Sequence, residues 1–238
     1  MRTNSYNLQG NTYLLETDID LAGVKFEPIL NKADNNLRFS SATSDALMGF
    51  NGIFDGQGHT ISNLEIAFDC SNIDNNDQPY TSVGLFGHIG EEGQVLNLNI
   101  TGADISYMSD KDMYPSSMGI VAGSSSGKIY NCHVEGQVSG AATVGGLVGT
   151  VRDGGVVDSC TVNATVTGYN EVGVLLGNIH MSTASNCTAQ GETIGEKNKH
   201  MDNKVLHDTV TPYAVGAMFG RIHYSTVMEC HGRIYCSE

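Results

Sequence analysis

The stretch Val144-Gly145-Gly146-Leu147-Val148-Gly149 decides the fold of this 238-residue chain, because the sequence repeats it. Five segments place apolar residues between an early glycine and a closing one: residues 83–87, 118–123, 144–149, 172–177 and 215–220. The closing glycines lie 36, 26, 28 and 43 residues apart, which indicates a unit of about 26–28 residues with insertions near residues 101–117 and 190–212. Self-similarity at such a period predicts a stacked repeat architecture.

A second short strand is expected after each glycine segment, and Cys160 begins it in the clearest copy. Residues expected to face inward (Cys160, Val162, Ala164, Val166) alternate there with residues expected to face outward (Thr161, Asn163, Thr165, Thr167). Alternation with a period of two is typical of a half-buried strand. A unit of short strands and glycine corners cannot bury its apolar face alone, but it can do so when it is stacked on its neighbours.

The chain is therefore predicted to be one all-β domain over residues 1–238, folded as a parallel β-helix (β-solenoid) of about six to seven turns. Residues 6–82 are expected to supply the N-terminal turns, and residues 83–236 the five repeats. Parallel crossover connections are almost always right-handed, so we expect a right-handed β-helix.

Composition narrows the possible partners. A net charge of −14, with 12 Lys and Arg and no basic run, disfavours nucleic acid. No apolar run approaches about 18 residues, so no membrane insertion is expected. No hydrophobic region follows Met1, which predicts either a cytosolic protein or a piece of a longer exported one. Because a last repeat exposes strand edges, we expect the natural protein to continue past Glu238 or to cover that end with a partner copy.

The repeat resembles a known family. The glycine segment, the Ser-Cys strand and the closing Val-Thr-Gly of residues 144–168 are similar to the GLUG motif, and parts of residues 7–64 are similar to the segment that commonly precedes it. GLUG repeats occur mainly in large secreted or surface-attached bacterial proteins, including adhesin-like proteins and the spacer of immunoglobulin-A-cleaving metallopeptidases. The resemblance therefore implies a surface, stalk or adhesion role. The zinc-peptidase signature His-Glu-x-x-His is absent from the sequence, so no peptidase activity is implied.

Six cysteines raise the alternatives of a disulfide framework or a metal site. Aligning the repeats instead places four of them at one inward position of successive turns: Cys132, Cys160, Cys187 and Cys230. Leu64 fits the same position earlier in the chain, and Cys70 and Cys236 fit a second inward position six residues later. Ligands about 4.8 Å apart cannot share one zinc ion, and in-register neighbours have the wrong Cβ approach for a disulfide. We therefore expect core thiols, with a disulfide as the alternative, and no metal or cofactor.

A second column is expected to face outward. Arg152, His180 and His223 each lie three residues after a closing glycine, and apolar residues that should point inward (Val151, Ile179, Ile222) precede them. Stacked on successive turns, they would form a cationic strip that could bind an anionic sugar or a carboxylate in a pH-dependent way. The alternative is an ordinary solvated face.

The insertion at residues 190–212 is the largest departure from the repeat and is the expected partner contact. Its candidate residues are Glu192, Lys197, His200 and His207. Catalysis is disfavoured, because the outward row of the second strand, expected to include Asn97 and His133, carries a single carboxylate, Glu135. Glycan hydrolysis needs paired acids.

The sequence thus predicts a non-catalytic, secreted or surface-anchored β-helix that serves adhesion, presentation or spacing within a larger bacterial protein. Its partners would be a host protein, a glycan or other domains of the same polypeptide. Two alternatives stay open: a glycan-active lyase or hydrolase of the same fold, and a cytosolic scaffold.

Overall fold

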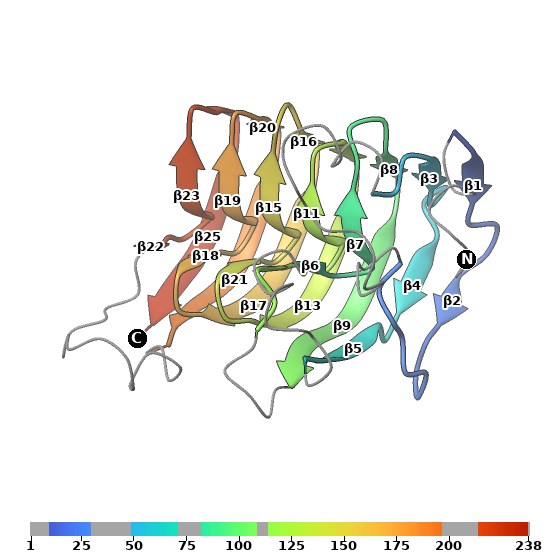
Figure 1. Cartoon of the computed structure of the whole chain (residues 1–238), viewed down its shortest axis with the longest axis horizontal. Helices are drawn as coiled ribbons and strands as arrows, with labels where there is room; N and C mark the ends of the chain where they lie inside the picture. Colours follow the sequence, from blue (N-terminus) through green and yellow to red (C-terminus); the bar gives the residue numbers. More distant parts are fainter. Residues whose placement is uncertain (1–9, 30–48, 71–81, 109–113, 197–213, 238) are drawn as a thin grey trace.

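The protein is a rod of stacked β-coils (Figure 1). The structure is a computed structural model that describes residues 10–29, 49–70, 82–108, 114–196 and 214–237. Within these ranges it contains strands and no helix, hence none long and apolar enough to cross a membrane. The chain advances along the rod from its N-terminal coil at one end to its C-terminal coil at the other.

Four sheets, here called A to D, form the faces of the rod. Sheet A consists of β1 (Thr12–Leu14), β3 (Ile53–Asp55), β8 (Gln94–Leu96), β12 (Lys128–Tyr130), β16 (Val156–Asp158), β20 (Thr183–Ser185) and β24 (Thr226–Met228). Sheet B consists of β2 (Ile19–Asp20), β4 (Thr60–Ser62), β9 (Asn99–Met108), β13 (His133–Ser139), β17 (Thr161–Gly168), β21 (Thr188–Gly195) and β25 (His231–Ser237), with β5 (Glu65–Asp69) also paired to β9.

The other two sheets begin later in the chain. Sheet C consists of β7 (Phe86–Ile89), β11 (Ala122–Ser125), β15 (Val148–Arg152), β19 (Leu176–His180) and β23 (Phe219–His223). Sheet D consists of β6 (Ser82–Val83), β10 (Ser117–Met118), β14 (Thr143–Gly145), β18 (Glu171–Gly173) and β22 (Ala214–Val215). Every described strand pairing is parallel, for example β13 with β17 and β14 with β18. Sheet A has seven strands, so we number coils 1 to 7 by them, and the predicted parallel β-helix is confirmed.

Side chains that point inward form continuous columns along the rod. The middle residues of the sheet A strands are Tyr13, Phe54, Val95, Ile129, Val157, Ala184 and Val227. The matching column of sheet B is Ile19, Ile61, Ile100, Val134, Val162, Ala189 and Gly232. Both columns hold their largest side chains in the first coils and smaller ones toward the C-terminal end. These two columns therefore narrow along the rod, whereas the inward columns of sheet C end in Phe219 and Ile222.

Corners between sheets A and B depend on residues in the left-handed backbone region. Asn97, Asn131 and Asn186 have φ values of 51°, 50° and 52° there, and asparagine tolerates this conformation better than most residues. Asn131 Nδ2 donates to Asn97 Oδ1 at 2.8 Å, which ties one corner to the next. The sequence alignment of Asn97 with His133 is therefore wrong: Asn97 lies at the corner, and Asn99 is the partner of His133.

The cysteine column lies next to this corner. Cys132, Cys160 and Cys187 are buried, whereas Cys230, one coil further, is half-buried. All six cysteines are free thiols. A hydrogen bond to the Cys160 thiol, together with burial, raises the pKa of Cys187, so this thiol stays protonated and unreactive at neutral pH.

Three other predicted core positions need correction. Asn63, with a φ of 56°, imitates the Asn-Cys corner in the middle of sheet B. Leu64 therefore lies beside Ala103 rather than in the cysteine column, and Ile66 takes the position expected for Cys70. Cys70 is buried beyond the end of β5. Cys236 lies on the last strand and is exposed, because none of the described residues stacks on that strand.

The two expected insertions begin as strand rather than as loop. Residues 101–108 belong to the ten-residue strand β9, whose second half pairs with β5. Residues 190–195 belong to β21, which pairs with β17 and β25. Strand β21 ends in register with β17, at the pair Gly168 and Gly195.

Candidate functional site

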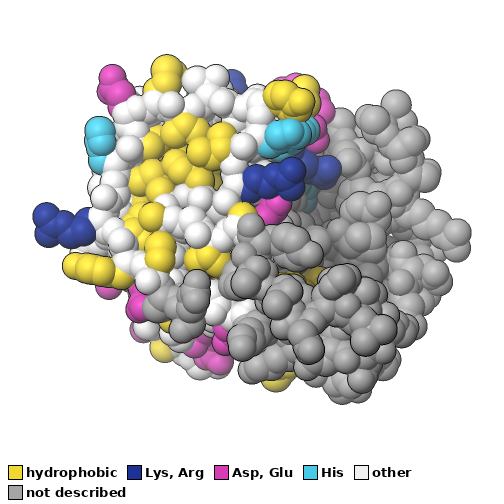
Figure 2. All heavy atoms as spheres, turned by 90° about the vertical axis from the view of Figure 1, so that its left-hand side faces the viewer, with side chains coloured by type: hydrophobic (Ala, Val, Ile, Leu, Met, Phe, Trp, Pro, Cys, Tyr) yellow, Lys and Arg dark blue, Asp and Glu magenta, His cyan; other side chains and the backbone are white. Residues whose placement is uncertain are grey.

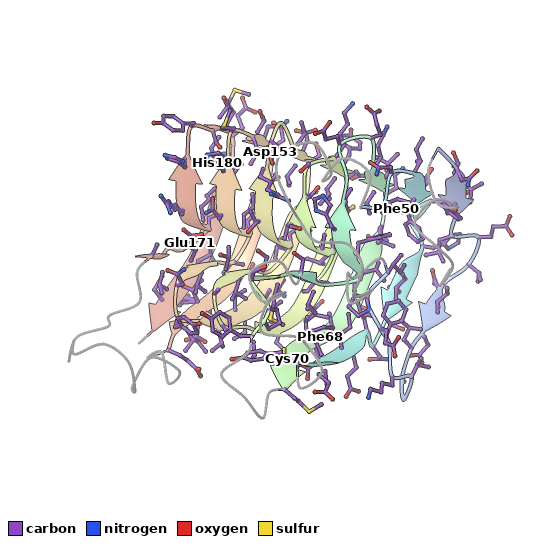
Figure 3. The ribbon with its side chains drawn as sticks, viewed as in Figure 1. Phe50, Phe68, Cys70, Asp153, Glu171 and His180 are labelled. Carbon is purple, nitrogen blue, oxygen red and sulfur yellow. The ribbon has the colours of Figure 1, made fainter. Side chains whose placement is uncertain are left out.

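The predicted cationic column lies where sheet C turns into sheet A. Register places Arg152 beside His180, and His180 beside His223, on consecutive strands β15, β19 and β23. The two imidazole rings stack with centroids 5.0 Å apart and an interplanar angle of 29°. Figure 3 shows His180 near Asp153 at this outer edge. The sequence thus identified three side chains that the fold brings together, and we call them the histidine ridge.

The histidine ridge is less cationic than its composition predicts. Arg152 Nε lies 3.8 Å from Asp153 Oδ2, and both side chains are solvent-accessible, which makes this a weak ion pair. The ring centroids of Tyr224 and His223 lie 4.1 Å apart with an interplanar angle of 43°, so Tyr224 packs against the ridge at a tilt. Ser126 follows Ser125, the partner of Val151, so serine occupies the ridge position in coil 4. The ridge could hold a carboxylate or stack against a planar group.

Sequence reasoning missed a row of polar side chains along the angle between sheets D and C, which we call the D–C seam. Sheet D contributes Ser82, Ser117, Thr143 and Glu171, and sheet C contributes His88, Ser124, Thr150, Asn178 and Arg221. Each sheet D residue lies two positions before the first glycine of its segment, and each sheet C residue directly follows the closing glycine. That regular polar flank was the signal available in the sequence.

Hydrogen bonds join the two sides of the seam. The hydroxyls of Ser117 and Thr150 are 2.8 Å apart, and those of Ser82 and Ser124 are 3.1 Å apart. Within sheet C, His88 Nδ1 lies 2.9 Å from Ser124 Oγ. Burial, followed by the charge of Arg152, lowers the pKa of His88 to about 4. His88 is therefore neutral at physiological pH, and it serves packing rather than cation chemistry.

Glu171 is the most heavily bonded group of the seam. It is 8% exposed and accepts hydrogen bonds from Asn178 Nδ2 at 2.6 Å and Arg221 Nη1 at 2.9 Å. Thr143 Oγ1 donates to the same carboxylate at 3.3 Å. This carboxylate spans three adjacent coils, and its lone pairs are engaged by neighbouring side chains. The arrangement locks the coils together and leaves Glu171 poorly placed as a proton donor or nucleophile.

Other outward-facing acids are tied to neighbouring coils in the same way. Asp104 accepts from Gln137 Nε2 at 2.8 Å, and Asp158 accepts from Ser185 Oγ at 2.6 Å. Within the described ranges, no group of three His, Cys, Asp or Glu side chains could hold a metal ion.

The predicted partner contact at residues 190–212 is only partly described. Glu192 lies on strand β21, between Thr165 and Tyr235 of the adjacent strands, so it belongs to sheet B rather than to a loop. Lys197, His200 and His207 lie outside the described residues.

The C-terminal coil differs from the coils before it. Ile222, expected to be inward-pointing, is 51% exposed, because none of the described strands follows β23 in sheet C. Figure 2 shows an apolar patch at this end of the rod, with histidine and basic side chains on two opposite sides of it. We call the inward-pointing residues of coil 7 the C-terminal face: Val215, Phe219, Ile222, Val227, Cys230, Gly232 and Ile234.

Comparisons with known proteins give two similarities. No family model matches the chain. The chain is 34% identical over 173 residues to halomucin of Haloquadratum walsbyi, a match that covers 68% of this chain and 2% of halomucin. Its fold is similar to that of a Bacteroides ovatus protein proposed to be an immunoglobulin A1 protease, with a TM-score of 0.58 and 18% identity over 99% of this chain and 71% of that one. The second likeness concerns the fold alone.

Proposed function

We propose that this chain is a non-catalytic β-helix module of a larger secreted or cell-surface protein, where it serves adhesion, presentation or spacing. The observation that carries the proposal is the match to a segment making up 2% of halomucin. A match to so small a part of a long protein suits a structural or recognition module, and the name halomucin is consistent with a cell-surface or secreted role. The GLUG resemblance of residues 144–168 points the same way.

The side chains of the rod support a structural role. Three carboxylates, those of Asp104, Asp158 and Glu171, bond an amide, hydroxyls or a guanidinium of adjacent coils. Acids used in this way stabilise the stack instead of facing one another across a substrate. The partner would be a host protein, a glycan or another domain of the same polypeptide, and the histidine ridge is its proposed contact.

A glycan array with the purified chain, run beside a degradation assay on the same glycans, tests this function. We expect binding to carboxylated glycans without new reducing ends. A triple variant with Arg152→Ser, His180→Ser and His223→Ser, which copies Ser126 of coil 4, should lose that binding. A matched control with Thr161→Ser and Thr188→Ser, on sheet B, should keep it. Released reducing ends would contradict the proposal and favour a glycan-active enzyme.

Cellular location provides an independent test. Protease treatment of intact source cells, followed by detection with an antibody against this chain, should remove the signal. Full protection in intact cells, with digestion only after lysis, would support the cytosolic scaffold instead.

A further inference from the structure

The pattern His-x-Ser occurs in two consecutive coils, as His180-Met181-Ser182 in coil 6 and as His223-Tyr224-Ser225 in coil 7. Register makes the two histidines direct partners on strands β19 and β23, and both residues are half-buried. Coil 6 is packed between coils 5 and 7, and its histidine still reaches solvent. The exposure of this position therefore does not depend on where the described strands end.

Serine hydroxyls hold the backbone of both histidines. Ser182 Oγ donates to the carbonyl oxygen of His180 at 2.9 Å, and Ser225 Oγ donates to that of His223 at 2.8 Å. Between the coils, Ser182 N donates to Ser225 Oγ at 3.2 Å, and Met181 N donates to His223 O at 3.0 Å. These bonds fix the spacing of the two histidines before any ligand binds, which lowers the cost of binding one.

The separation of the two imidazole rings suits a shared metal ion. Their centroids are 5.0 Å apart. With a metal–nitrogen bond of about 2.0–2.1 Å and about 1.1 Å from that nitrogen to the ring centre, each centroid would lie about 3.2 Å from the ion. Ligand angles of about 90° to 109°, as in square-planar and tetrahedral sites, then place the centroids about 4.5–5.2 Å apart. Coordination therefore needs rotation about side-chain bonds but no movement of the strands.

The surroundings leave the imidazoles available to a cation. In the described part of the chain, neither ring forms a hydrogen bond or an ion pair, and Tyr224 packs against His223 with ring centroids 4.1 Å apart. The nearest like charge is Arg152, whose Nε lies 3.8 Å from the carboxylate of Asp153. The net charge of −14 favours the capture of cations over anions. A neutral imidazole nitrogen is also the commonest protein ligand of metal ions.

We propose that His180 and His223 together bind one divalent transition-metal ion, Cu²⁺ most tightly, through one ring nitrogen each. Imidazole suits copper, nickel and zinc, and affinity within this group is highest for copper, whereas calcium and magnesium take oxygen ligands. Water fills the remaining positions of the ion. The inference goes beyond the proposed function, because binding of the ion needs no glycan, and either can fail without the other.

Calorimetric titration of the full chain with Cu²⁺ tests the site. We expect one tightly bound ion per chain, weaker binding of Zn²⁺ and none of Mg²⁺. His180→Gln and His223→Gln should each weaken Cu²⁺ binding by about ten-fold or more. The double variant should bind little more weakly than either single variant, because a chelate is lost with its first ring. His133→Gln, which changes an exposed histidine of sheet B, is the matched control and should bind like the wild type.

Circular dichroism verifies that the variants fold. A glutamine variant that does not fold is replaced by its serine counterpart, since Ser126 occupies the ridge position in coil 4. A wild-type chain that binds no Cu²⁺ up to about 1 mM, a weak-affinity limit, overturns the proposal. So does a double variant that loses clearly more than either single variant, which would indicate two independent single-histidine sites. Glycan binding measured with a chelator present tests the proposed function separately.

Discussion

Coil 6 and coil 7 have nearly the same sequence pattern, yet they form different environments. Ile179 of coil 6 is 0% exposed, and Ile222, its neighbour in the same column, is 51% exposed. Val172 and Val215 repeat this contrast in sheet D, as Cys187 and Cys230 do beside the A–B corner. The residue types hardly change between the two coils. Coil 6 is packed between coils 5 and 7, whereas none of the described strands follows coil 7. Position in the stack therefore decides which apolar residues form the core.

The contrast has an energetic meaning. Burying a branched aliphatic side chain contributes roughly 1.5–3 kcal/mol relative to leaving it exposed. The middle coils gain this from both neighbours, whereas among the described residues coil 7 is stacked on coil 6 alone. Coil 7 is therefore expected to contribute less stability per residue than the middle coils.

The largest expected effect comes from separating two middle coils. A Cβ on Gly177 would lie 2.7 Å from both Gly149 O and Val144 N, which are backbone atoms of coil 5. Gly177→Val should push coil 6 away from coil 5 and cost more than about 4 kcal/mol of unfolding free energy, measured by urea denaturation. Gly154→Ala is the control, because nothing lies within 4 Å of that Cβ. Its positive φ should limit the cost to about 1–2 kcal/mol, so equal losses would contradict the account.

The pH dependence of folding stability gives a second test of the comparison, because coil 3 contains a buried histidine. His88 of coil 3 is 9% exposed with a pKa of about 4, whereas His223 of coil 7 lies on the surface ridge. Because the unfolded chain binds this proton more tightly, stability is fully present above pH 6.5 and is lost as pH falls toward about 4.

The loss from His88 should reach roughly 3 kcal/mol. It should be absent in His88→Asn, which keeps a hydrogen-bonding side chain without titrating in this range. Urea denaturation of both proteins across this pH range isolates the contribution of His88, since their carboxylates are shared. Parallel pH profiles would show that His88 is not a buried neutral group.

Removing the hydrogen-bonding carboxylate of Asp158, at the corner between sheets A and B, should have the smallest effect on stability. Hydrogen bonds from Ser185, Asn186 and Ser159 hold the pKa of Asp158 below its ordinary value. The aligned position in coil 7 holds Met228 instead, with Ser185 between them. Asp158→Asn should cost about 1 kcal/mol or less at pH 7, because the site is partly exposed.

The sign of its pH dependence follows from the lowered pKa. The contribution of Asp158 is present above its ordinary pKa and is lost as pH falls through the lowered one. Thermal unfolding of the two proteins should therefore converge in acid. Asp153→Asn, at a weak surface ion pair, is the control and should change the stability little. A cost equal to that of Asp158→Asn would contradict a stabilising role for the hydrogen bonds of Asp158.

Much of the fold could be predicted because the repeat restates it in each coil. Alternation around Cys160 identified the inward column, and the three ridge residues aligned because they keep a constant distance from the closing glycines. The predicted register of the strands was wrong where the backbone geometry departs from the repeat. The left-handed Asn63 imitates the corner before Cys132, which shifted Leu64 into the wrong column.

The D–C seam could not be recognised from residue types alone. Serine, threonine, histidine and glutamate share its positions, so no single motif marks it, and the partners of Glu171 lie as far away as Arg221. The exposure of Ile222 was missed for a related reason. A periodic pattern predicts which way a side chain points, but it does not predict whether another coil covers it.

The matched isoleucines test most directly that stack position decides the core. Ile179→Ala removes the same atoms as Ile222→Ala, in the same column of sheet C. Urea denaturation at a concentration where the chain is monomeric should give a loss of about 2–5 kcal/mol for Ile179→Ala and less than about 1 kcal/mol for Ile222→Ala. Equal losses at the two positions would show that coil 7 is as well covered as coil 6 and would contradict the account.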